Sequence, residues 1–510
     1  MSETENINRL KLKRLGIDTL YEHVIFIKSD SHICKSEGFE ALTRVKVANG
    51  NLNIVATLDV ISSDLIGTDE ASLSESGCEA LQASDGDEIE ITHLSPIDSI
   101  GLVRAKIYGK ELSDDNYYVI MNDIVQGNYS TVHLTGFVTA VACRKMGVSE
   151  IVGLTRAMIN TGEKLSWPYP VIMDKHCIGG IPANRTTPIA VSIAAAFGLI
   201  IPKTSSRAIT SPAGTADVMD VFTNADIGIA QIQDVVKTEG ACLCWGGALH
   251  ISPADDILIR IERSLDIDCE AQMIASVLSK KKAAGSTNVL IDIPYGTTAK
   301  VRSLEDAEHL GELFEKVADK IGLKIKVIIT DGLQPVGIGI GPELEARDVL
   351  AVLKNQPGAP QDLKEKALQL ASALLELSGQ VNYGEGYGIA NETLISGKAF
   401  EKFKSICLKQ GRYTEPIDYA PYKHDILSSY TGIVTSVDNR KLAKVAKLAG
   451  APNDPAAGIM FYAHLNTSVY KGQTLYTVFA NSPGQLDYAL EYAKQQNHIV
   501  KIQQYGEGLD

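Results

Sequence analysis

The sequence has little that would suit a secreted, membrane-spanning or nucleic-acid-binding protein. Its eight cysteines include no C-x-x-C pair and only Cys242 and Cys244 lie close together, so we expect reduced thiols, with neither a disulfide framework nor a zinc site. The longest apolar run, residues 188–201, contains Ser192 and is too short to span a bilayer, so a buried helix is expected. The net charge of −14 argues against a nucleic-acid or anionic-membrane surface.

Other signals are also missing. The acidic start, Met1 to Glu5, shows no signal-peptide pattern, so we expect a cytoplasmic protein. There is no internal repeat and no low-complexity tract, so domain boundaries must come from changes of pattern. What is present is ordinary for a globular protein, with 45% hydrophobic and 22% charged residues. The 510 residues suffice for about three domains.

Four patterns follow one another along the chain. Residues 1–95 hold short alternating runs separated by turn signals, which predicts a β module, a small barrel or sandwich, with a binding or assembly role. Residues 96–168, together with 255–285, are helical in pattern, and Ser113 is a candidate N-cap. Residues 169–422 alternate strand and helix patterns, which favours a doubly wound α/β domain. Residues 423–510 suggest a small α+β domain.

The stretch from 169 to 222 carries the clearest chemistry. An apolar run, 171–173, stops at Asp174-Lys175-His176-Cys177 and predicts a strand, and a loop with Gly179 and Gly180 follows. Thr187 suits an N-cap and Pro188 the first helical position, so this helix start predicts a phosphate site. An ordinary strand-to-helix turn would need the same glycines.

Basic and hydroxyl side chains favour the anion site over that alternative. Lys175 and Arg185 flank the glycine loop, and a second loop, 205–215, is rich in hydroxyls and contains Arg207. We therefore interpret both loops as anion-binding. We expect Lys175→Ala and Arg207→Ala each to abolish activity.

Separated motifs resemble those of the thymidine/AMP phosphorylase family. The motifs are Lys175-His176-Cys177-Ile178-Gly179-Gly180, Ser206-Arg207-Ala208-Ile209-Thr210-Ser211 and Asp331-Gly332-Leu333-Gln334-Pro335. The long N-terminal β module is similar to that of archaeal-type AMP phosphorylases and type 2 thymidine phosphorylases. The resemblance implies a nucleoside-phosphorylase-like α/β domain, a small helical domain, an N-terminal β-barrel-like module and a C-terminal α+β domain.

The resemblance also implies an activity and its site residues. In this family inorganic phosphate attacks the anomeric carbon of a nucleoside or nucleotide, and the base leaves. The implied phosphate-binding residues are Lys175, Cys177, Thr186, Ser205 and Thr215. Cys177 departs from the family's usual serine, and a thiol is a weaker hydrogen-bond donor.

The implied contacts to the nucleoside differ between two branches of the family. The pyrimidine branch implies His176, Arg260, Ser276 and Lys280. The AMP branch implies Gly180, Ser206, Arg207, Ala208, Ile209, Thr210, Ser211, Thr215, Ser276 and Lys300, with Asp268 as proton donor. A proton-donating aspartic acid needs a raised pKa, for instance through burial.

Plainer explanations exist for several of these residues. Asp268 suits a helix N-cap equally well, and His176 could merely orient its loop. Ser276 and Lys280 are four residues apart and could lie on a solvent-exposed helix face.

The resemblance implies a small-molecule enzyme, a homodimer or larger homo-oligomer, with phosphate as co-substrate and no other cofactor or metal. Two alternatives stay open. One is a phosphoribosyltransferase of similar fold that uses magnesium and a pyrophosphorylated ribose. The other is a degenerate enzyme that acts as a binding or assembly protein through its N-terminal module.

Overall fold

The computed structural model describes residues 8–20, 22–208, 211–249, 251–416, 419–496 and 498–505. They form two compact units. The first comprises Met1–Arg144 with Ile257–Glu262, and the second comprises Lys145–Asp256 with Arg263–Asp510.

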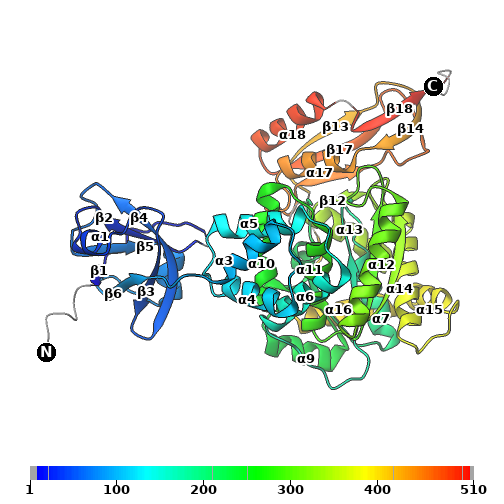
Figure 1. Cartoon of the computed structure of the whole chain (residues 1–510). Helices are drawn as coiled ribbons and strands as arrows, with labels where there is room; N and C mark the ends of the chain where they lie inside the picture. Colours follow the sequence, from blue (N-terminus) through cyan, green and yellow to red (C-terminus); the bar gives the residue numbers. More distant parts are fainter. Residues whose placement is uncertain are drawn as a thin grey trace. The chain divides into compact units, whose positions relative to one another are not determined.

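The first unit begins with a closed six-stranded barrel, drawn in blue in Figure 1, in the order β1-β5-β2-β4-β3-β6. Alternate residues point inward and close its core; in β3, Val45 and Val47 are fully buried. This confirms the β-barrel-like module. The strands are β1 (Arg9–Leu12), β2 (Val24–Lys28), β3 (Arg44–Asn49), β4 (Leu52–Ile61), β5 (Glu70–Leu73) and β6 (Glu88–His93), with short helices α1 (His32–Glu37) and α2 (Glu75–Ala80).

Helices follow the barrel in the same unit: α3 (Ser99–Ile107), α4 (Asp114–Val125) and α5 (Thr131–Ala142). Ser113 caps α4 as expected, because its side chain accepts the Asn116 N–H while the Asn116 side chain accepts the Ser113 N–H.

The second unit contains parallel strands, as the alternating pattern predicted. β7 (Met173–Cys177), β10 (Asn288–Tyr295) and β11 (Lys324–Asp331) form a sheet in the order β11-β10-β7. A second parallel pair joins β8 (Ile201–Ser205) to β9 (Ala241–Trp245). The first strand of each group, β7 and β8, leads into one of the two loops that the sequence singled out.

Helix α7 (Thr186–Phe197) is the centre of this unit. Every residue from Thr186 to Ala195 is buried, as expected for a helix packed on all sides. The other helices are α6 (Val148–Asn160), α8 (Thr215–Phe222), α9 (Ile229–Glu239), α10 (Pro253–Leu265, which contributes to both units), α11 (Glu270–Ala283), α12 (Leu304–Lys320), α13 (Pro342–Leu353), α14 (Gln361–Leu377), α15 (Gly386–Ile395) and α16 (Lys398–Lys409).

The C-terminal α+β part, orange to red in Figure 1, is continuous with the α/β part. One sheet runs β12-β15-β17-β13, so β12 (Gly339–Ile340) of the α/β segment pairs with C-terminal strands. A second sheet runs β16-β14-β18. The elements are β13 (Tyr422–Leu427), β14 (Gly432–Val437), α17 (Asn439–Leu448), β15 (Gly458–Phe461), β16 (Ser468–Val469), β17 (Thr474–Ala480), α18 (Pro483–Gln495) and β18 (Val500–Gln504).

Among the helices of the described ranges, none combines the length and apolarity that crossing a bilayer requires.

Candidate active site

Strand β7 is the element on which the site is built. The predicted strand is present and runs from Met173 through Cys177, so it extends beyond the apolar run to the start of the glycine loop. Its charged residues are tolerated inside the sheet because each has a partner. The buried Asp174 carboxylate lies 2.9 Å from the Lys281 Nζ and 3.8 Å from the Lys203 Nζ.

Lys175 is buried, and its ammonium group donates to two hydroxyls. Its Nζ lies 2.9 Å from Thr186 Oγ1 and 3.2 Å from Thr187 Oγ1, both in the first turn of α7. Burial lowers the pKa of Lys175. The structure therefore brings together Lys175 and Thr186, two of the residues implied for phosphate.

The same contacts correct the predicted start of α7. The helix begins at Thr186, and its N-cap is Arg185, which makes no side-chain capping bond. The prediction that Thr187 is the N-cap, followed by Pro188 as the first helical residue, is therefore wrong. The physical reason is that the Thr187 hydroxyl bonds to Lys175 inside the protein.

Cys177 lies at the end of β7, opposite Asp292 in the register of β10. Burial, followed by the Asp292 carboxylate, raises the pKa of the Cys177 thiol to about 11. The group is therefore a neutral thiol at physiological pH and keeps its weak donor. Its sulfur accepts a hydrogen bond from the Asn184 Nδ2 at 3.4 Å.

A buried pair of lysines lies beneath the site, and the sequence interpretation missed it. Lys203 of β8 and Lys281 of α11 share the Asp174 carboxylate. Burial, and then repulsion by Lys281, lowers the pKa of Lys203 to about 7. The sequence offered one sign of this pair, because Lys203 interrupts the otherwise apolar start of the strand formed by residues 201–205.

His176 is half-buried among these cations. Burial together with Lys281, Lys203 and Lys175 holds the pKa of His176 well below its usual value. The imidazole is therefore neutral near pH 7, with one nitrogen that can donate and one that can accept a hydrogen bond.

Arg185 joins the two loops. Its Nη1 donates to Thr215 Oγ1 at 2.8 Å, and its Nε donates to Glu345 Oε2 at 2.7 Å. Glu345 is almost fully buried and was not identified from the sequence, because it lies 160 residues further along the chain. Thr215 is thus tied to the first loop, whereas the Ser205 hydroxyl is buried with no hydrogen-bond partner among the described residues.

Arg207 is paired with carboxylates. Its Nη1 lies 2.5 Å from Asp220 Oδ2 and 3.3 Å from Asp217 Oδ1, and its guanidinium carbon lies 5.0 Å from the centre of the Trp245 ring. The other Asp217 oxygen accepts the backbone N–H groups of Ala208 at 2.7 Å and Gly214 at 2.8 Å.

The other implied residues of the loop after β8 differ in exposure and in hydrogen bonding. Ser206 is exposed, and the Ser211 hydroxyl donates to the Ala213 carbonyl at 2.9 Å. Ile209 and Thr210 lie outside the described residues.

Gly180 and Lys300, both implied by the AMP branch, come into direct contact. Gly180 has φ +93°, and a Cβ there would lie 2.2 Å from the Lys300 backbone nitrogen, so only glycine permits this approach. The Lys300 Nζ lies 2.8 Å from Asp268 Oδ1, and the Asp268 side chain is 66% exposed.

Asp268 lies just before α11 but does not cap it. The N-cap of α11 is Cys269, so the alternative that Asp268 caps this helix is wrong. Its role as proton donor stays a prediction, and its side chain is exposed.

Ser276 and Lys280 converge on one buried carboxylate. Ser276 Oγ donates to Asp255 Oδ2 at 2.8 Å, and the Lys280 Nζ lies 2.6 Å from the same oxygen. Despite burial, the Asp255 and Asp256 carboxylates raise the pKa of Lys280. These residues are therefore not a solvent-exposed helix face. Arg260 lies in the part of α10 that groups with the first unit.

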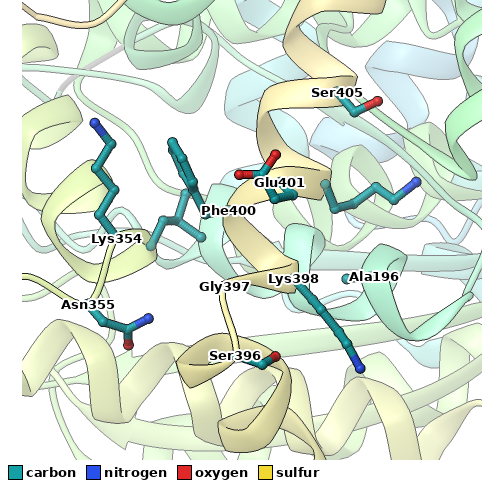
Figure 2. A pocket seen from close by; sticks show the side chains of 11 residues that line it. Ala196, Lys354, Asn355, Ser396, Gly397, Lys398, Phe400, Glu401 and Ser405 are labelled. Atoms are coloured by element: carbon teal, nitrogen blue, oxygen red, sulfur yellow. The ribbon is translucent and has the colours of Figure 1, made fainter.

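The cavity shown in Figure 2 lies elsewhere in the second unit. It has a volume of about 770 Å³ and is lined by the end of α13, the start of α16 and Ala196. None of the sequence-predicted site residues lines it. Of its three lining lysines, Lys354 and Lys402 are partnered, since the Lys354 Nζ lies 2.7 Å from Glu415 and the Lys402 Nζ 3.0 Å from Glu239; the third is Lys398.

Family models cover most of the chain. The helical bundle domain of the glycosyl transferase family matches residues 101–162, and the a/b domain of that family matches residues 169–400. The C-terminal domain of pyrimidine nucleoside phosphorylases matches residues 433–500.

Curated relatives match almost the full length. A "Putative thymidine phosphorylase" of Legionella pneumophila (strain Paris) is 49% identical over 96% of this chain and 95% of its own length. One of Polaromonas sp. (strain JS666 / ATCC BAA-500) is 50% identical over 97% of both chains. One of Hahella chejuensis (strain KCTC 2396) is 47% identical over 98% and 99%.

Among solved structures, anthranilate phosphoribosyltransferase from Thermus thermophilus matches 60% of this chain and 98% of its own, with a TM-score of 0.51 and 21% identity. At that identity the likeness concerns the fold alone. The family models and the near full-length relatives together show that the chain belongs to the thymidine phosphorylase family of glycosyltransferases and is a pentosyltransferase.

Proposed function

We propose that this protein catalyses the phosphorolysis of a nucleoside or a nucleoside 5′-monophosphate, giving free base and pentose 1-phosphate. A phosphate oxygen forms a bond to the anomeric carbon, the carbon–nitrogen bond to the base breaks, and its electron pair passes to the base. The site must therefore hold a phosphate anion and neutralise charge on the leaving base.

The observation that carries this proposal is the placement of Lys175. Its buried ammonium group donates to threonine hydroxyls at the start of α7, so a cation and a helix N-terminus point to the same place. Such a pairing favours a phosphate. In this proposal Thr186 and Thr215 add hydroxyl contacts, and the Cys177 thiol adds a weaker one.

The leaving base would meet a second group of side chains. The neutral His176 can donate or accept a hydrogen bond, and Lys280 with Ser276 presents a donor-rich face organised by Asp255. Asp268, ion-paired with Lys300, is the proposed proton donor.

The proposal includes phosphate as co-substrate without another cofactor, a cytoplasmic location and a homo-oligomer. The scattered free cysteines support a reducing compartment.

The test is incubation of the intact protein with inorganic phosphate and a panel of nucleosides and 5′-monophosphates, with detection of free base. Base release that requires phosphate and persists in EDTA is expected. Activity only with a pyrophosphorylated ribose and magnesium would instead support a phosphoribosyltransferase. No turnover of any panel member would support the degenerate binding protein.

A further inference from the structure

A second cavity of the second unit is lined by basic residues and by no acidic residue. It has a volume of about 400 Å³ and is formed where four segments meet. They are the loop after β8, the end of α10, the end of α17 with the turn that follows it, and the first turn of α18. The polar and charged side chains of its lining include those of Ser211, Arg263, Lys447, Asn453 and Gln485.

Two cations, Arg263 and Lys447, line this cavity. Among the residues that the structure describes, neither of them forms an ion pair. The half-buried Lys447 ammonium has its pKa lowered by burial and then by the positive charges of Arg263 and Lys444. Arg263 is thus close enough to Lys447 for the two positive charges to repel each other.

A carboxylate next to this cavity is hydrogen-bonded to a neutral amide rather than ion-paired with Arg263 or Lys447. Asp454, next to the lining residue Asn453, accepts a hydrogen bond from Gln485 Nε2. In the cavity of Figure 2, two of the three lining lysines, Lys354 and Lys402, are paired with glutamates, whereas neither Arg263 nor Lys447 has such a partner among the described residues. The adjacent Arg207 is also paired, in its case with two aspartates.

The donors that remain suit one class of ligand. Arg263 offers a planar guanidinium that can bind two oxygens of one anion, Lys447 offers a point charge, and the exposed Asn453 offers an amide. Gln485 lies in the first turn of α18, whose N-terminus adds positive potential. A dianion with several oxygens at one centre can use all of these groups together.

We propose that this cavity binds a phosphate monoester through Arg263 and Lys447. The ligand's phosphate has two possible sources: the 5′-phosphate of the substrate, which rests on the proposed function, or a separate phosphorylated sugar. The cavity shares Ala208 and Ser211 with the loop after β8, so a ligand there would contact that loop directly.

The primary test measures binding without turnover. Calorimetry with ribose 5-phosphate is performed on the intact protein, on Arg263→Gln, on Lys447→Gln and on the double variant. We expect binding by the unmodified protein and a loss of about tenfold or more in affinity for each cation removed, as for other charge-assisted hydrogen bonds. Lys444→Gln removes one positive charge from the same helix outside the lining and is expected to bind nearly as the unmodified protein does.

Kinetics then distinguish the two sources. If the 5′-phosphate occupies the cavity, the double variant raises KM for the nucleoside 5′-monophosphate at least about tenfold and leaves KM for the unphosphorylated nucleoside unchanged. If a separate phosphorylated sugar occupies it, ribose 5-phosphate binds without competing with the nucleotide.

Absence of binding by the unmodified protein, or equal binding by a folded double variant, would overturn the proposal. Because calorimetry needs no reaction, this failure is separate from failure of phosphorolysis, which is read from the unphosphorylated nucleoside.

Discussion

The loops that follow β7 and β8 look alike in sequence but differ in how nearby cations are neutralised. Each leads from a parallel strand to a helix and contains a basic residue among small and hydroxyl residues. Beside the first loop, the ammonium of Lys175, which belongs to β7 itself, donates to neutral hydroxyls, while the loop's own Arg185 pairs with Glu345. After β8, the Arg207 guanidinium pairs with two carboxylates.

The carboxylate of Asp217 explains the difference. It accepts the N–H groups of Ala208 and Gly214, which are the kind of donors that a bound anion would use, and its other oxygen also faces Arg207. The second loop therefore carries its own internal anion. Beside the first loop, Lys175 of β7 bonds to hydroxyls instead, and in the proposed function its cation meets the phosphate.

The largest effect should come from Lys175→Met. Removing the buried cation should lower kcat/KM for phosphorolysis by about 10²–10³-fold, the usual loss for one preorganised electrostatic donor. The measurement is free-base release at varied phosphate. Lys354→Met is the matched control, because that lysine lines the cavity of Figure 2 and pairs with Glu415. Equal activity in the two variants would contradict the assignment.

A smaller effect is expected for Arg207→Gln, which revises the expectation from sequence that removing Arg207 abolishes activity. Its two half-exposed ion pairs are each worth roughly 1 kcal/mol or less, so we expect a loss of about thirtyfold at most. Asp217→Ala should lower activity more than Arg207→Gln does, because two backbone N–H groups of the loop lose their acceptor. The comparison fails if Arg207→Gln is as inactive as Lys175→Met.

The barrel and the α/β alternation could be predicted because they depend on local patterns. Alternating apolar and polar residues predicted strands where β3 and β4 lie, and the apolar run of residues 188–201 predicted the buried helix α7. The barrel's closure could not be predicted, because it needs parallel pairing of β1 with β5 and of β2 with β4, which are distant in sequence.

The sequence predicted which residues form the candidate site, but not which side chains form ion pairs and hydrogen bonds with them. Resemblance named Lys175 and Thr186, yet it could not reveal that Glu345 holds Arg185 or that Lys203 and Lys281 share Asp174. Ion pairs of this kind join segments that are remote along the chain. A similar tertiary contact moved the start of α7, because the Thr187 hydroxyl bonds to Lys175.

Two adjacent glycines offer a test of the first loop's geometry through stability. Gly179 and Gly180 both have positive φ, but only at Gly180 would a Cβ collide with Lys300. Gly179→Ala should therefore cost roughly 1–2 kcal/mol of backbone strain, and Gly180→Ala clearly more. Urea unfolding of both variants measures the difference. Equal costs would mean that the Lys300 segment does not approach the loop this closely.

The smallest expected effect is a change in how stability depends on pH. Lys203 has a pKa lowered to about 7, against an ordinary value of 10.5. Between these values the unfolded chain holds a proton that the folded protein has released, so Lys203 makes stability rise with pH. Lys203→Met removes this slope and leaves Asp174 paired with Lys281. Urea unfolding at pH 7 and pH 9 should therefore show the unmodified protein gaining stability relative to Lys203→Met, whereas Lys444→Met, at an exposed position, controls for the lost charge. A constant difference between the unmodified protein and Lys203→Met at both pH values would show that Lys203 is not held as a neutral amine beneath the Lys175 loop.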